Sequence, residues 1–95
     1  MLGNFFSIHD IVTEQDAADA AQSLCNDALE AVNAGRGRMR KMRTAQRNLD
    51  ILIGKCHMEQ WAAPLQRLSQ VFKILESESA RDIANMFSIS NSSSN

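Results

Sequence analysis

Residues 18–56, ADAAQSLCNDALEAVNAGRGRMRKMRTAQRNLDILIGKC, decide the fold of this chain. Within them a set of mostly small and apolar side chains recurs at gaps of mostly three and four residues. The set is Ala18, Ala21, Cys25, Ala28, Val32, Gly35, Met39, Met42, Gln46, Leu49, Ile53 and Cys56. This spacing places the set along one narrow stripe of a helix, as in the seam of a coiled coil. Because such a stripe must be covered by another helix, the sequence predicts association through helices.

The composition indicates one small all-α domain. The chain has 95 residues, of which 44% are hydrophobic and 22% are charged, which suits a single domain with a modest core. Aromatic residues make up 5%, with no tyrosine and one proline, and this scarcity argues against a β-rich fold. No apolar run approaches the roughly 20 residues of a membrane span, and residues 1–10 lack the features of a secretory signal.

A long first helix is predicted from about residue 14 to 58. Thr13 is a good N-cap, with the acid Asp16 in the first turn. Gly35 and Gly37 each weaken a helix interior by about 1 kcal/mol relative to alanine. The stripe nevertheless keeps its phase across both glycines, so the helix is predicted to continue through them.

A bend at residues 59–63 and a second helix at about 64–87 follow. Pro64 disfavours helix in the residue before it and is tolerated in a first helical turn. The second helix either folds back on the first as a hairpin or extends it as a kinked rod. Residues 1–12 form an apolar lead-in, and residues 88–95, rich in serine and asparagine, are predicted to be a disordered tail.

The predicted fold class is therefore all-α. A long heptad-patterned helix precedes a second amphipathic helix, in a helical hairpin or coiled-coil-like bundle that self-association completes. The predicted helix interface consists of Ala28, Val32, Met39, Met42, Leu49, Ile53, Leu65, Leu68, Phe72 and Leu75.

Charge is divided unevenly along the chain although its net value is −1. Residues 1–30 carry acids and no lysine or arginine, and a basic patch follows. The patch consists of Arg36, Arg38, Arg40, Lys41, Arg43 and Arg47. Such a run favours an anionic partner, and the acidic segment of a second copy is the simplest one. Nucleic acid is disfavoured because no aromatic side chain interleaves the arginines for base stacking.

Neither catalysis nor a metal site is predicted. Cys25 and Cys56 lie on the stripe, where a reduced cysteine packs as a small apolar residue. Cys56 and His57 are a lone neighbouring pair without the ligand spacing of a zinc site. The sequence holds no glycine-rich phosphate loop and no recognisable nucleophile with its base, so no enzyme, cofactor or metal is expected.

Three segments resemble the C-terminal core-helix region of bacterial flagellins. They are residues 27–33 (DALEAVN) with Arg36 and Met39 after them, residues 74–86 (ILESESARDIANM), and the lead-in at residues 10–13 (DIVT). The likeness covers about residues 8–87. The two glycines, the basic run, the cysteines, Trp61 and Pro64 depart from ordinary flagellin helices.

The resemblance implies a bacterial, non-enzymatic structural protein that self-associates or pairs with a partner helix like the flagellin N-terminal segment. It also implies an export chaperone and a flagellar or extracellular location reached by type III-type export. The alternative is a cytoplasmic helical adaptor or regulator, similar to a secretion chaperone or a phage protein. That alternative would bind a protein or nucleic acid through the basic face at residues 36–47.

Overall fold

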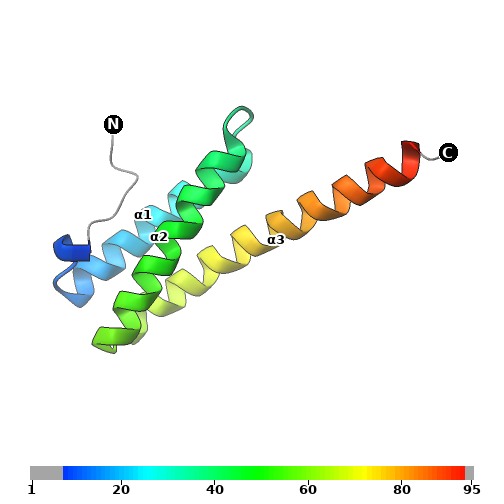
Figure 1. The fold of residues 1–95 in the computed structure, drawn as a ribbon. Helices are drawn as coiled ribbons and strands as arrows, with labels where there is room; N and C mark the ends of the chain where they lie inside the picture. The colour runs from blue at the N-terminus through cyan, green and yellow to red at the C-terminus, as the bar shows by residue number, and fades with distance from the viewer. Residues whose placement is uncertain (1–7, 94–95) are drawn as a thin grey trace.

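The computed structural model describes residues 8–93 and shows three α-helices preceded by one short 3-10 turn (Figure 1). The elements are η1 (Ile8–Asp10), α1 (Glu14–Asn33), α2 (Arg38–Glu59) and α3 (Ala62–Ser93). The all-α prediction is confirmed, and no strand occurs in this part of the chain. Within it, none of the helices combines the length and apolar content of a bilayer-spanning segment.

The start of α1 follows the sequence prediction. The Thr13 side chain accepts a hydrogen bond from the Asp16 backbone N–H at 3.1 Å, and the Asp16 carboxylate accepts the Thr13 N–H at 3.0 Å. The same carboxylate accepts the Val12 N–H at 3.0 Å. These bonds form a capping box, which satisfies backbone donors that the first helical turn leaves unpaired.

The prediction of one helix from residue 14 to 58 is wrong, because the chain turns back at residues 34–37. Ala34 is extended, with a ψ of 142°, and Gly37 has a φ of 77° in the left-handed region. Glycine reaches that region without the steric cost that a Cβ imposes. The turn makes α1 and α2 antiparallel neighbours, which lets them bury their small side chains against each other.

The second turn lies close to the predicted bend. Gln60 caps α2 with a φ of 62°, and the Trp61 backbone N–H donates to the Cys56 carbonyl at 2.9 Å. The Trp61 side chain packs partly buried against the core, and the Lys55 ammonium lies 5.9 Å from the centre of its ring, within cation–π range. Helix α3 begins at Ala62, with Pro64 buried in its first turn.

Helix α3 is longer than predicted. It runs to Ser93, so the disorder expected from residue 88 is not what the structure describes up to that point. Its 32 residues span about 48 Å, against about 30 Å for the 20 residues of α1. The C-terminal end of α3 therefore extends past the α1–α2 hairpin (Figure 1). Of the predicted lead-in, residues 1–7 lie outside the described residues, and Ile11 is buried in the core.

The core lies along the line where the three helices meet, and its side chains recur every three or four residues. Alanines dominate the α1 contribution and allow close helix approach, whereas larger aliphatic side chains come from α2 and α3. The buried side chains include Ala17, Ala21, Leu24, Ala28 and Ala31 of α1, Met42, Ala45, Leu49, Leu52 and Cys56 of α2, and Leu68, Val71 and Leu75 of α3. Each fully buried leucine contributes about 1.5–3 kcal/mol. Half of the predicted stripe is thus buried within a single chain, namely Ala21, Cys25, Ala28, Met42, Leu49 and Cys56.

Candidate interaction surface

The ten predicted interface residues divide into three groups. Ala28, Met42, Leu49, Leu68 and Leu75 are buried. Val32, Ile53 and Leu65 are partly buried and pack against the core. Met39 and Phe72 are exposed by 62% and 44%, so their assignment to the helix interface is wrong for the single chain.

The phase of α2 explains why Met39 is exposed. After the turn at residues 34–37, the buried positions of α2 run through Met42, Ala45, Leu49 and Leu52, and Met39 lies to one side of that stripe. Phe72 likewise follows the buried Val71 directly and flanks the buried face of α3. The sequence prediction missed the exposure of Met39 because it carried one helical phase unbroken through the glycines. It also included Phe72, whereas the buried face of α3 runs through Leu68, Val71 and Leu75.

An apolar groove opens between α2 and α3. The two helices meet at the Gln60–Trp61 turn and separate towards their other ends (Figure 1). The space between them measures about 340 Å³. Its walls include Met39, Met42 and Arg43 of α2 and Leu75, Ile83 and Met86 of α3. We call this feature the apolar groove.

The apolar groove has a buried floor and exposed apolar edges. Met42 and Leu75 are 8% and 2% exposed. Met39, Ile83 and Met86 are 62%, 54% and 69% exposed. Exposed apolar side chains that gather at one place on a surface mark interaction sites more often than scattered ones do.

Arg38 connects α2 to α1 and α3 at the open end of the groove. Its guanidinium donates to the Asp82 carboxylate at 2.8 Å and to the Glu78 carboxylate at 2.9 Å, both on α3. Its Nε donates to the Val32 carbonyl at the end of α1, at 3.2 Å. The hydrogen bond to Asp82, followed by the one to Glu78, raises the pKa of the Arg38 guanidinium above its ordinary value. One residue therefore links all three helices.

The acidic partners of Arg38 were not predicted from the sequence. Glu78 and Asp82 follow the buried Val71 and Leu75, and the gaps along this series are four, three and four residues. They continue the inward-facing stripe of α3 as acids where the hairpin ends. An acid at a stripe position is a detectable sequence feature, but choosing its partner required knowing that residue 38 begins a separate helix.

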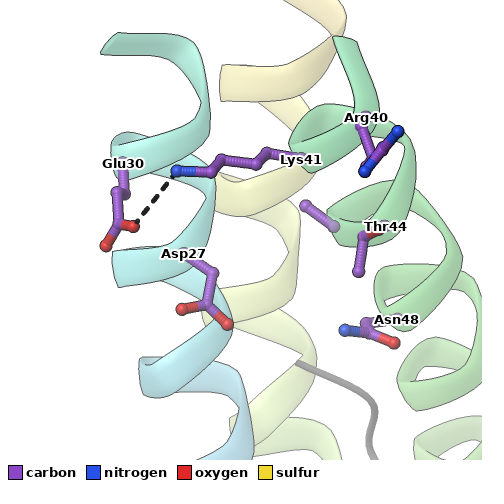
Figure 2. A pocket seen from close by; sticks show the side chains of 7 residues that line it. Asp27, Glu30, Arg40, Lys41, Thr44 and Asn48 are labelled. Atoms are coloured by element: carbon purple, nitrogen blue, oxygen red, sulfur yellow. Dashed lines mark ion pairs between the residues drawn. The ribbon is translucent and has the colours of Figure 1, made fainter. Parts of the chain in front are cut away.

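Lys41, a second member of the predicted basic patch, also has an acidic partner in the chain. Its ammonium lies 3.7 Å from the Glu30 carboxylate of α1 (Figure 2). The pair borders a polar pocket of about 200 Å³ between α1 and α2, with Asp27 and Thr44 in its lining. Burial, with a smaller effect from the nearby Glu30 charge, raises the pKa of the Asp27 carboxyl.

The remaining arginines of the basic patch face solvent. Arg40, Arg43 and Arg47 are exposed at gaps of three and four residues along α2, and we call them the arginine row. Arg36 is exposed in the turn before α2. No ion pair joins any of these four to the acids of residues 8–93. The basic patch thus separates into two neutralised cations and four cations without an acidic partner there.

The two cysteines and the possible metal ligands of the described residues show no arrangement for chemistry. Cys25 and Cys56 are buried and unbonded, as their predicted packing role requires. Burial, with a smaller effect from the Glu14 charge, raises the pKa of the Cys56 thiol. Among residues 8–93 no group of three or more histidine, cysteine, aspartate or glutamate side chains is arranged to hold a metal ion.

Comparison of the chain with protein-family models, curated proteins and solved structures gives no match.

Proposed function

We propose that this protein is a non-enzymatic adaptor that binds a segment of another protein in the apolar groove between α2 and α3. The supporting observation is the gathering of Met39, Ile83 and Met86 around one hollow, each more than half exposed. Methionine suits such a surface because its flexible, polarisable side chain adapts to different partners. This proposal keeps the adaptor class but moves its contact from the basic face alone to the groove beside it.

The flagellin-like assembly role is the competing proposal, and it rests on the sequence resemblance. Its predicted contact is the stripe that includes Ala28, Met42 and Leu49, and all three side chains are buried within one chain. Assembly through that stripe would require the bundle to open and expose its core. The apolar groove needs no opening, and this difference favours the adaptor. Type III-type export, an export chaperone and a flagellar location remain predictions from the resemblance.

The proposal is tested by replacing single residues with the photo-crosslinking amino acid benzoylphenylalanine in living cells of the organism that makes the protein. Met39 and Met86 report on the groove. Met58, which is 73% exposed at the other end of α2, is the matched control. We expect the same adduct from the two groove positions and none from the control.

Two outcomes would count against the adaptor. Equal adducts at all three positions, or none at any of them, would mean that the groove has no selective partner. An adduct of two 10.6 kDa chains would instead support self-association.

A further inference from the structure

We infer that the apolar groove receives an amphipathic helix of a different protein, and that this helix carries acidic residues along the edge that faces Arg43 and Arg47. The inference rests on the proposed function and specifies the partner of the same site. It is argued from the shape of the groove and from the charges beside it.

The walls of the groove favour a helical occupant. Met39 and Met42 on α2, and Ile83 and Met86 on α3, are each three residues apart. They form two short apolar rows, between which a third helix can place side chains three and four residues apart. An extended segment would gain no backbone pairing there, since the backbone groups of α2 and α3 are bonded within their own helices. A helix brings its own backbone hydrogen bonds.

The charges beside the groove favour an acidic edge. Arg43 lines the groove, and Arg47 is exposed one helical turn further along α2. Arg40 instead lines the polar pocket between α1 and α2. Asp82, an acid in the groove wall, is already bound to Arg38. Arg43 and Arg47, which have no ion pair with the acids of residues 8–93, therefore leave uncompensated positive charge along one rim. A partner with complementary charge associates faster and is selected over basic competitors.

A second copy of this chain fits the groove poorly. Asp19 and Glu30 are exposed on α1, but the apolar face of that helix is buried in its own core. On α3, Ile83 and Met86 are exposed and Glu76 is an exposed acid of the same helix, but Ile83 and Met86 already line the groove of their own chain. A symmetric contact between two grooves would also bring two arginine rows together. In the described part of a copy, the exposed apolar row with an acid beside it is therefore on α3, where Ile83 and Met86 are walls of the groove itself.

The test uses three synthetic helical peptides of about 18 residues, roughly 27 Å long. All three carry leucines at spacings of three and four along one face, and they differ only in having glutamate, glutamine or lysine along one edge of it. Binding to the full chain is measured by fluorescence anisotropy at about 0.1 M and about 1 M salt, where the screening length falls from about 10 Å to about 3 Å.

We expect the glutamate peptide to bind roughly tenfold more tightly than the lysine peptide at low salt, with the glutamine peptide in between. The difference should shrink at high salt. Arg43→Glu should reverse the order of the two charged peptides. Arg67→Glu is the matched control, since Arg67 is exposed near the joined end of α3, and it should leave the order unchanged. Met39→Gln should weaken all three peptides.

Each of the other results contradicts the inference and points to a different alternative. Equal binding of the three peptides, still weakened by Met39→Gln, refutes the acidic edge and leaves the adaptor standing. No binding of any peptide refutes the helical occupant. The crosslinking experiment then tests separately whether the groove binds another protein. If a DNA duplex binds instead, sensitive to Arg43→Glu but not to Met39→Gln, the surface is a nucleic-acid interface. If the chain dimerises and Met39→Gln separates the dimer, the occupant is a second copy.

Discussion

Arg38 shows how one side chain can join three helices. It is the first residue of α2, yet it bonds the last turn of α1 and two carboxylates of α3. Charge-assisted bonds of this kind are shorter and stronger than neutral ones. Without the guanidinium, Glu78 and Asp82 would face each other as like charges four residues apart, which destabilises a helix.

Arg38→Met is therefore expected to lower the thermal midpoint of unfolding, because methionine keeps part of the packing but none of the hydrogen bonds. Arg40→Met is the matched control on the same helix, where the arginine is exposed and has no ion pair among residues 8–93. Circular dichroism melting of both variants, at low and at high salt, checks this. Equal midpoints for the two variants would show that the contacts of Arg38 contribute nothing to stability.

Asp16 makes the stability of the bundle depend on pH. The hydrogen bonds from the backbones of Thr13 and Val12 lower the pKa of its carboxyl below the ordinary value of 3.8. A carboxyl whose pKa is lower in the folded state than in the unfolded state adds stability above the unfolded value. That stability is lost as the pH falls through the folded value. The stability advantage of the wild type over Asp16→Asn should therefore be larger at neutral pH than at about pH 2.

Urea unfolding of the two proteins at both pH values measures this advantage directly. Asparagine keeps an oxygen that can accept hydrogen bonds, so the comparison isolates the charge. A difference in the free energy of unfolding that stays constant with pH would contradict the expectation.

At the scale of elements, the turn at residues 34–37 has the largest effect on the fold. Gly37 holds a left-handed backbone directly before α2, with a φ of 77°. No neighbouring atom lies within 4 Å of a Cβ built on Gly35 or on Gly37. Space is therefore available at both positions, and only the backbone angle distinguishes them.

Gly37→Ala should destabilise the protein by about 1–2 kcal/mol, the cost of placing a Cβ in the left-handed region. Gly35→Ala, two residues away and free of that constraint, should be neutral or stabilise by up to about 1 kcal/mol through the unfolded state. Urea denaturation of the two single variants provides the comparison. Equal effects would mean that the turn does not depend on the left-handed residue.

At the scale of the whole molecule, the bundle covers its core along the hairpin and leaves the separated ends of α2 and α3 unfilled. The molecule measures 56 × 28 × 15 Å, and its length comes from α3. Stability and the proposed partner binding therefore depend on different residues. Leu68 is fully buried among the three helices, whereas Met39 is 62% exposed.

Leu68→Asp should abolish cooperative melting. An unpaired acid in the core costs more than about 4 kcal/mol, most of the stability of a small domain. Met39→Asp should change the free energy of unfolding by no more than about 0.5 kcal/mol, as exposed substitutions do, while removing partner binding. Thermal and urea unfolding of both variants check this. Loss of cooperative melting in Met39→Asp would show that Met39 is buried, most simply by a second chain.

Much of the molecule follows from residue order because the interactions concerned are local. The all-α class, the capping box of Thr13 and Asp16, the bend near Pro64 and the burial of Leu49, Leu68 and Leu75 all arise from spacings within a few residues. The solvent-facing arginines at positions 40, 43 and 47 follow in the same way, because α2 buries its opposite side.

The turn at residues 34–37, the pairing of Arg38 with Glu78 and Asp82, and the apolar groove depend on how distant segments meet. A continuous helix and a broken one differ locally by only about 1 kcal/mol per glycine. Burial of α1, α2 and α3 against one another exceeds that difference. Because the chain turns at Gly37, Met39 lies outside the core and Arg38 lies within reach of α3. The local spacing of residues cannot predict the exposure of Met39 or the contacts of Arg38, because both result from tertiary packing.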